Sequence, residues 1–123
     1  MCQIAIAIVI RNDHVLVGRR PATAVLAGYR EFPGGKVEAG ELPHAAAERE
    51  TLEETGLSVR ATETLEIVRH NYDHGELELH FVRCELANTQ LEPRAPFTWL
   101  PRQQLAEADF PPANRTVIAR LIK

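Results

Sequence analysis

Hydrophobic and polar positions along this chain follow two periods, which predict strands and helices. Residues 3–10 form an almost continuous apolar run, which is typical of a central strand buried on both faces. After a turn at 11–13, Val15 and Val17 alternate with Leu16, and this predicts the returning strand of a hairpin. The other apolar or alternating stretches predict strands at 29–33, 59–72, 76–86 and 97–100.

The two longest predicted strands, 59–72 and 76–86, are joined by a turn at 73–75. The apolar anchors of the first strand are Leu65, Ile67 and Val68. The second strand alternates between an apolar face and a polar face that contains Glu78 and His80. An earlier stretch, 21–28, is predicted to be a surface loop.

A helical period predicts the remaining elements. Pro43 suits a first helical turn because its missing N–H would be unpaired there, and Gly56 is a natural stop. Shorter helices are predicted at 101–108 and 115–122, with a loop between them. Strands and helices in this mixed order predict an α/β fold, with a mixed β-sheet between helices.

Glutamates cluster on one face of the helix that ends at Gly56. Because each helical residue advances about 100°, Glu50, Glu53 and Glu54 fall within an arc of roughly 100°. They repel one another unless a cation lies between them, and hard cations such as Mg²⁺ prefer these oxygen ligands beside substrate phosphates. A solvated acidic helix face is the alternative. The preceding glycine-rich loop, with Lys36 beside it, favours a phosphate and metal site.

The loop and the helix together carry a motif with fixed spacing: Gly35, five residues, Glu41, seven residues, then Arg49-Glu50-Thr-Leu-Glu53-Glu54-Thr-Gly56-Leu57. This spacing resembles the signature of the Nudix hydrolases. Thr51 departs from a position that is aliphatic in the signature, and we expect this to affect packing and not chemistry. The resemblance implies one Nudix domain over residues 1–123, with an α/β/α sandwich around a mixed β-sheet.

Two further stretches, 31–38 and 109–121, resemble the MutT-like branch of that family, the 8-oxo-dGTP diphosphatases that clean the nucleotide pool. The resemblance implies hydrolysis of 8-oxo-dGTP to the monophosphate and pyrophosphate. The substrate-binding positions of the branch fall on Arg20, Phe32, Tyr72 and Asn114. Asn114 would read the base edge, because an amide both donates and accepts hydrogen bonds. The other interpretation of Asn114 is a helix N-cap.

The resemblance also assigns roles around the phosphates. Mg²⁺, or Mn²⁺ in its place, would be held by the Gly34 carbonyl and by Glu50, Glu53 and Glu54. Glu53 is the first choice for general base or principal ligand. Arg49 would orient a glutamate, Lys36 would neutralise phosphate charge, and Glu41 would brace the loop.

One stretch departs from the branch, which has a further metal-binding glutamate before a tryptophan-containing strand. In the corresponding residues 92–99, Glu92 serves only with a shift of one residue. Without that ligand, the number of metals and the identity of the general base stay open.

Two other functions stay open as well. The first is a Nudix pyrophosphohydrolase that acts on CTP or on oxidised pyrimidine nucleotides. The second, from another class, is a non-catalytic domain that senses nucleotides, although a pure binder has no need of the complete carboxylate set.

Composition limits the classes of molecule that this protein is expected to bind. A formal net charge of −3 disfavours a nucleic-acid polymer as partner, and the run 4–10 is too short to span a membrane. Cys2 and Cys84 show neither metal-type spacing nor a disulfide framework, which fits a reducing cytoplasm. We expect a nucleoside triphosphate as partner, and a monomer or homodimer. His70, His74 and His80 lack a ligand-pair motif for zinc, so we expect exposed histidines.

Overall fold

The computed structural model describes residues 2–21, 28–72, 75–88 and 91–123. The strands are β1 (Cys2–Arg11), β2 (His14–Arg19), β3 (Arg30–Glu31), β4 (Gly34–Lys36), β5 (Val59–Tyr72), β6 (Gly75–Leu86) and β7 (Thr98–Pro101). The helices are α1 (Pro43–Thr55) and α2 (Arg115–Leu121), with two 3₁₀ helices, η1 (Arg102–Glu107) and η2 (Pro112–Asn114). This is the mixed α/β fold that the pattern predicted.

Strand β1 is the centre of the sheet, as its apolar run indicated. It pairs in parallel with β6 from Cys2 to Val9, and antiparallel with β4 and β2. The strand order is β3-β2-β1-β6-β5, with β7 paired to β2. The parallel pair makes the sheet mixed, because the remaining pairs are antiparallel.

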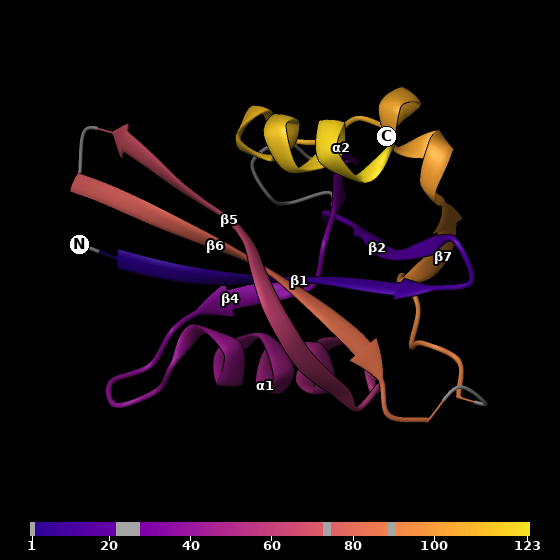
Figure 1. Ribbon diagram of the computed structural model, residues 1–123, viewed down its shortest axis with the longest axis horizontal. Coiled ribbons are helices and arrows are strands. Elements are labelled where there is room, and N and C mark those ends of the chain that lie inside the picture. Colours follow the sequence, from indigo (N-terminus) through magenta and orange to yellow (C-terminus); the bar gives the residue numbers. More distant parts are fainter. Residues whose placement is uncertain (1, 22–27, 73–74, 89–90) are drawn as a thin grey trace.

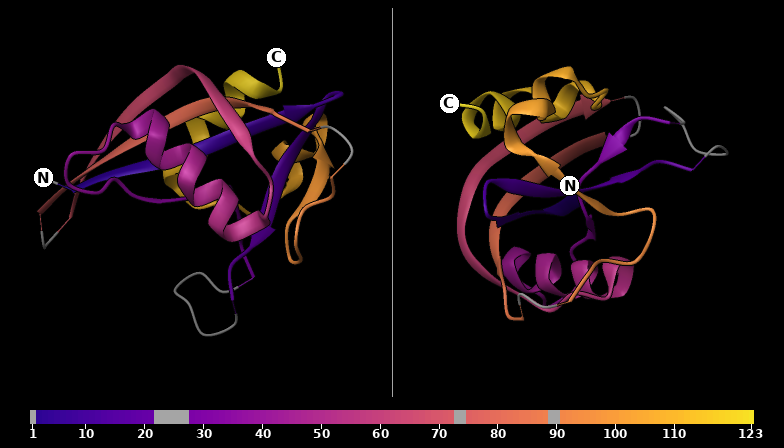
Figure 2. Two further views of the ribbon diagram at one scale, coloured as in Figure 1. Left: turned by 90° about the horizontal axis from the view of Figure 1, so that it is seen from below. Right: turned by 90° about the vertical axis from the view of Figure 1, so that its right-hand side faces the viewer.

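Helical layers cover both faces of this sheet (Figures 1 and 2). Helix α1 lies on one face, where the small side chains of Ala5 and Ala7 meet those of Ala46 and Ala47 in one buried cluster. Helix α2 and η1 lie on the other face, over a second cluster that includes Phe81. The alanines let α1 approach the sheet closely, which brings its polar face toward the edge of β4.

Helix α1 begins and ends as predicted. Pro43 opens it, and Gly56 closes it with a φ of 79°, a left-handed conformation that glycine adopts without a Cβ clash. Thr51 is fully buried, and its hydroxyl donates to the Ala47 carbonyl over 2.7 Å. The departure from the motif is therefore accommodated by a local hydrogen bond.

The main correction to the predicted elements concerns the glycine-rich stretch, which was predicted to be a loop. Gly34 to Lys36 form strand β4, which pairs antiparallel with Ile4 to Ile6 of β1. A Cβ on Gly34 would collide with the Ala5 carbonyl, so glycine here allows close approach to β1 and not a loose turn. The predicted strand at 29–33 shrinks to β3, and the predicted helix at 101–108 is the 3₁₀ helix η1.

The expectation of exposed histidines was wrong for His80, which is only 8% exposed. Its Nε2 lies 2.6 Å from Oε1 of the buried Glu78, which also accepts hydrogen bonds from Gln3 and Arg69. Those hydrogen bonds, first that of Gln3, lower the pKa of Glu78 to about 2. Ile67, predicted as an anchor, is 52% exposed.

Three predictions fall wholly or partly outside the described residues: the loop at 21–28, the turn at 73–75 and the position of His74. The predicted loop at 109–114 contains η2. In the described part of the chain, no helix is long and apolar enough to cross a membrane.

Candidate active site

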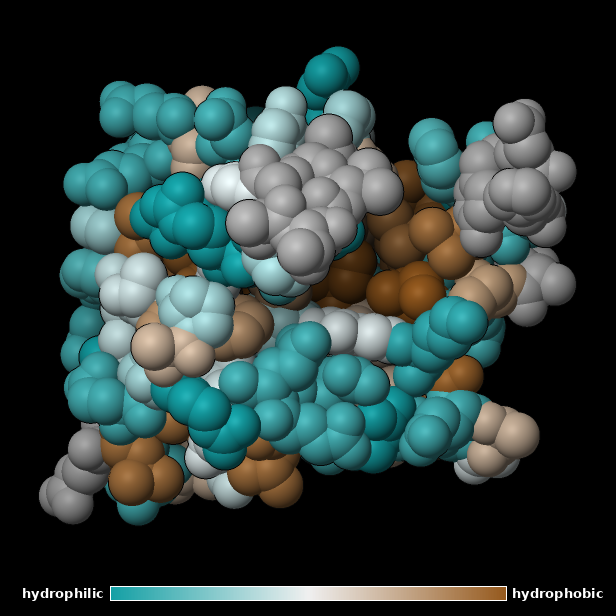
Figure 3. Space-filling view, turned by 180° about the vertical axis from the view of Figure 1, so that it is seen from behind, coloured by the Kyte–Doolittle hydropathy of each residue, from teal (hydrophilic) through white to brown (hydrophobic). Residues whose placement is uncertain are grey.

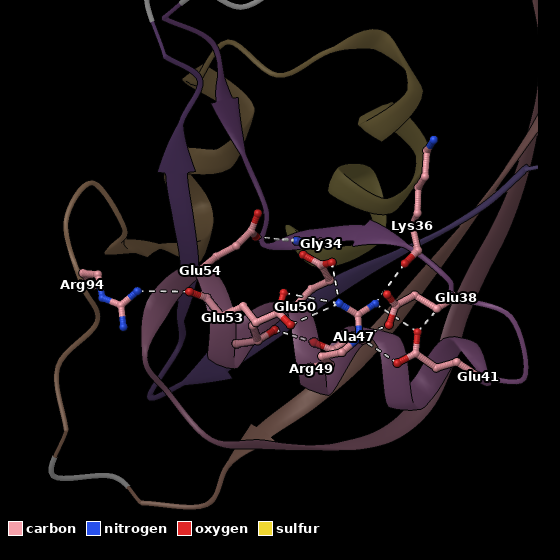
Figure 4. Close-up of polar contacts among 11 residues, drawn as sticks. Gly34, Lys36, Glu38, Glu41, Ala47, Arg49, Glu50, Glu53, Glu54 and Arg94 are labelled. Carbon is pink, nitrogen blue, oxygen red and sulfur yellow. Dashed lines mark hydrogen bonds and ion pairs between the residues drawn. The ribbon is translucent and has the colours of Figure 1, made fainter.

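The polar face of α1 lies against β4 and against the loop that joins the two. Figure 4 shows Glu50 and Glu53 of α1 beside Arg49, with Glu54 turned toward Gly34. Arg49 contacts both oxygens of Glu41, Nε to Oε2 over 2.8 Å and Nη2 to Oε1 over 3.0 Å. Its Nη1 donates to Glu50 over 2.8 Å and lies 3.4 Å from Glu53. Arg49 therefore joins four parts of the motif, since Nη2 also donates to the Lys36 carbonyl over 3.0 Å.

Glu41 is the most tightly held carboxylate of this group. Hydrogen bonds from Arg49 and from the Glu38 backbone N–H lower the pKa of Glu41 to about 2. Hydrogen bonds to Glu41 and then to Glu50 raise the pKa of Arg49, so Arg49 and Glu41 both stay charged. This pair fixes the loop 37–41 against α1, which is the contact that a bracing role for Glu41 requires.

Glu54 is placed differently, with its carboxylate partly buried against β4. Its Oε1 accepts the Gly34 backbone N–H over 2.9 Å. Burial is the largest influence on its pKa and outweighs that hydrogen bond. Together with repulsion from Glu50, Glu31 and Glu53, it raises the pKa of Glu54 to about 7. The cluster thus holds more negative charge than its neighbours neutralise.

Glu50 packs directly on the backbone of β4. A Cβ on Gly35 would lie 2.5 Å from the Glu50 carboxyl carbon, so only glycine leaves room for this carboxylate. Lys36, the next residue, is exposed, and its side chain extends away from the glutamates in Figure 4. The structure thus brings Gly34, Glu50, Glu53 and Glu54 together and leaves the Lys36 ammonium outside the cluster.

We tested whether this donor set suits a divalent metal ion. Carboxylate oxygens are the ligands that hard cations prefer. A cation beside Glu54 would offset the burial and the repulsion from neighbouring carboxylates that raise the pKa of Glu54. As the side chains stand, no three Asp, Glu, His or Cys residues in the described ranges are arranged to hold a metal. Arg49 engages Glu50 and Glu53 instead. The residues fit a metal by chemistry and charge, and binding requires those two carboxylates to turn from Arg49.

A cavity of about 180 Å³ opens beside the glycines of β4, and it contains three of the four predicted substrate residues. Its lining consists of Ile4, Ile6, Arg20, Glu31, Phe32, Gly34, Gly35, Pro111 and Asn114. Figure 3 shows apolar residues gathered in a hollow, with a hydrophilic band along its border. An apolar floor beside a carboxylate cluster suits a molecule with a flat ring at one end and phosphates at the other.

The walls of this cavity come from distant parts of the chain. Phe32 is buried and stacks on Phe110 with ring centroids 4.7 Å apart. Arg20 directly follows β2, and its Nη1 is 3.4 Å from Glu31 Oε1. Glu31 was missed by sequence reasoning, although it stands in the stretch 31–38 that resembles the MutT-like branch. Its pKa is raised because burial outweighs the attraction of Arg20.

Asn114 is buried, with 9% of its surface exposed. It occupies the N-cap position of α2, yet its side chain makes no capping hydrogen bond there. Its Nδ2 instead donates to the Pro111 carbonyl over 3.2 Å. The other amide N–H and the amide oxygen are thus available to a ligand in the cavity. Tyr72 ends β5 with its backbone paired to Gly75, and its side chain lies outside the described part of the structure.

A larger hollow of about 600 Å³ lies along the loop 37–41 and includes Cys2 and Gln3. Of these two hollows, the smaller cavity is the one that brings Phe32 next to the glycines of β4, which contact Glu50 and Glu54.

The loop before β7 brings Arg94 to α1, whereas Glu92, the candidate for a further metal ligand, lies elsewhere. Glu92 is exposed and pairs with Arg11 over 3.5 Å. Arg94 lies at the C-terminal end of α1, where its Nη1 donates to the Glu53 carbonyl over 3.1 Å (Figure 4). Sequence reasoning missed Arg94, because a single arginine in a proline-containing loop carries no signal of its partner.

Comparisons with known proteins agree with this geometry. A family model described as a NUDIX domain matches residues 5–120. An 8-oxo-dGTP diphosphatase of Escherichia coli K12 is 36% identical over 124 residues, which cover 97% of this chain and 95% of the relative. A CTP pyrophosphohydrolase of the same organism is 40% identical over 63 residues, 51% of this chain and 47% of that protein. The solved structure of MutT, of the Nudix hydrolase family, from methicillin-resistant Staphylococcus aureus 252 superposes with a TM-score of 0.79 at 27% identity, covering 98% of this chain and 95% of that one.

Proposed function

The chain belongs to the Nudix hydrolase family, and on that premise we propose that it hydrolyses 8-oxo-dGTP to 8-oxo-dGMP and pyrophosphate. The observation that carries the proposal is the cavity that joins Asn114, Phe32 and Arg20 to the glycines of β4. A relative that matches 97% of the chain is named for this activity, which supports the same choice of substrate. We take residues 1–123 as one domain, in keeping with the family match over 5–120.

The purine would lie in the cavity. Phe32, already stacked on Phe110, offers an apolar surface to the base, and the Asn114 amide offers a donor and an acceptor to its edge. Arg20 is placed to contact the sugar or a phosphate, because a guanidinium suits phosphate oxygens. Tyr72 remains a proposed wall of the same site.

Nudix hydrolases generally need a divalent metal, and we assign Mg²⁺ here, with Mn²⁺ as a substitute. Glu50, Glu53, Glu54 and the Gly34 carbonyl would hold it. The bound ion would neutralise phosphoryl charge and lower the pKa of water.

The proposed reaction is attack of water on the β-phosphorus, assisted by residues of this chain. A water oxygen forms a bond to the β-phosphorus, and the bond from that phosphorus to the oxygen bridging to the α-phosphorus breaks. The bridging oxygen leaves with the nucleoside monophosphate. Glu53 is our first choice to accept the proton of the water, because its carboxylate is exposed and only loosely contacted by Arg49. Arg49 would orient Glu41, so that Glu41 braces the loop 37–41, and Lys36 would turn toward the phosphates.

A steady-state assay with Mg²⁺ and a panel of 8-oxo-dGTP, dGTP, CTP and oxidised pyrimidine nucleotides tests the proposal. We expect the highest kcat/KM for 8-oxo-dGTP and no turnover after chelation of the metal. Binding without turnover of any nucleotide would point instead to a sensing domain.

A second candidate substrate is CTP. It is favoured by the local match to a CTP pyrophosphohydrolase, although that match spans only 51% of the chain. A preference for CTP in the same assay would replace 8-oxo-dGTP and leave the proposed chemistry at the phosphates unchanged.

A further inference from the structure

Helix α1 places two acidic residues in an electrostatically unfavourable position. Glu53 and Glu54 lie in its last turn, where the helix dipole is negative, and that turn contains no basic residue of its own. The last carbonyls of a helix also lack partners within the helix. The turn that would hold the metal ligands therefore needs both hydrogen-bond donors and a cation from elsewhere.

Arg94 supplies both. Its backbone N–H donates to the Thr55 carbonyl over 2.8 Å, and its Nη1 donates to the Glu53 carbonyl over 3.1 Å. A Cβ on Gly56 would lie 3.4 Å from Arg94 Nη2, so the guanidinium lies close over the end of the helix. One residue thus satisfies two terminal carbonyls and brings a positive charge to the negative end of α1.

Two neighbouring residues of that loop, Glu92 and Phe97, have other contacts. Glu92 pairs with Arg11, and Phe97 is buried with its backbone N–H donating to the Arg94 carbonyl. The loop therefore presents Arg94, and not Glu92, to the end of α1.

We propose that Arg94 is a positioning residue for the metal site: by holding the Glu53 carbonyl, it fixes the last turn of α1 so that Glu53 and Glu54 point to a common site. This inference rests on the proposed function. The guanidinium touches backbone and not substrate, so it acts through the orientation of those two carboxylates.

The variant Arg94→Met removes the guanidinium and keeps the aliphatic stem. The backbone bond from residue 94 to Thr55 remains, so the loop stays attached to α1. Arg94→Lys restores a charged donor that reaches one carbonyl. Arg120→Met is the matched control, because Arg120 lies on α2, across the sheet from α1, and pairs with Glu66 of β5.

Three quantities are measured for each protein: kcat and KM with Mg²⁺ and 8-oxo-dGTP, the affinity for Mn²⁺ without nucleotide by electron paramagnetic resonance, and the melting temperature. For Arg94→Met we expect kcat and Mn²⁺ affinity each to fall about tenfold, the scale of one lost charged hydrogen bond. KM should change by less than about twofold, since that bond does not touch substrate. Arg94→Lys should recover most of both losses, and Arg120→Met should match the wild type.

Two outcomes would overturn the positioning role. A lower melting temperature with unchanged kcat and Mn²⁺ affinity would make Arg94 a stabilising helix cap only. A raised KM with unchanged Mn²⁺ affinity would make it a substrate contact. If the wild type hydrolyses no nucleotide, the proposed function fails, while the Mn²⁺ titration still decides the role of Arg94.

Discussion

The Glu54 carboxylate accepts a hydrogen bond from the Gly34 backbone N–H over 2.9 Å, and this bond ties the last turn of α1 to β4. Alone, it would lower the pKa of Glu54. Burial and three neighbouring carboxylates outweigh it, and the pKa stands at about 7 compared with an ordinary 4.5. The metal-free site is therefore a place where stability depends on pH.

We predict that the metal-free protein loses stability as pH rises from 5 to 8. Because the folded-state pKa of Glu54 is raised, its stabilising contribution is complete below pH 4.5 and is lost as pH rises through about 7. Glu54→Gln cannot ionise, so its stability advantage over the wild type, measured as the free energy of unfolding, should be greater at pH 8 than at pH 5. We expect that increase to be about 1–2 kcal/mol, because solvent screens this partly exposed carboxylate. Denaturant melts at both pH values, with chelator present, measure this difference.

The matched control is Glu63→Gln, which changes an exposed glutamate on β5. Its stability difference from the wild type should be the same at both pH values. Saturating Mg²⁺ should raise the stability of the wild type at pH 8 more than that of Glu54→Gln, because a ligand of the folded state stabilises it. A constant difference between Glu54→Gln and the wild type across pH would contradict the raised pKa.

We predict that Glu53→Gln abolishes turnover while the fold survives. The substitution keeps the size of the side chain and removes one charge from a repulsive cluster, so the metal-free melting temperature should stay equal or rise slightly. Turnover with saturating Mg²⁺ and the melting temperature are measured together, with Glu63→Gln as control. Near-normal turnover would remove Glu53 from the role of base or principal ligand.

Labelling with ¹⁸O shows which phosphorus atom the water attacks, and therefore which bond breaks. Attack of water on the β-phosphorus leaves the new oxygen in pyrophosphate, whereas attack on the α-phosphorus leaves it in the monophosphate. We therefore expect that hydrolysis in ¹⁸O-labelled water gives labelled pyrophosphate by mass spectrometry. Label in the nucleoside monophosphate would refute attack on the β-phosphorus.

Local signals in the sequence predicted α1 and the longer strands β1, β5 and β6 well. Pro43 and Gly56 mark the ends of α1 through their own backbone chemistry, and the apolar run of β1 marks a central strand without knowledge of its partners. The motif likewise placed the glutamates of α1 on one face.

Features that depend on distant partners were missed. Gly34 and Gly35 resemble a loop in sequence, and they form a strand because β1 lies alongside them. His80 is buried on β6, which pairs in parallel with β1. That pairing sets Gln3 beside Glu78, the carboxylate that His80 contacts. Arg94 contacts the C-terminal end of α1 because the loop before β7 folds back onto the helix, and no local pattern in the sequence indicates that contact.

The last prediction concerns the base. Oxidation converts N7 of guanine from an acceptor into an N–H donor, next to the acceptor O6. An amide can bond to both at once, whereas guanine itself shows two acceptors there. Asn114 keeps one amide N–H and its amide oxygen available beside the cavity, because the contact that the structure gives it uses only Nδ2 toward Pro111.

We therefore predict that Asn114→Ala lowers kcat/KM for 8-oxo-dGTP by about tenfold to a hundredfold, the effect of losing a buried hydrogen-bonding partner worth about 1–3 kcal/mol. The loss for dGTP should be smaller, so the selectivity ratio should fall.

The lost bond to the Pro111 carbonyl should reduce the free energy of unfolding by about 1 kcal/mol. Both quantities are measured in the same variant. Thr116→Ala is the control, because it removes an exposed hydrogen bond of 2.7 Å from α2 to Glu66, away from the cavity. If the ratio is unchanged while stability falls, Asn114 supports α2 and does not read the base. The preference for an oxidised purine would then depend on Phe32, Arg20 and the shape of the cavity.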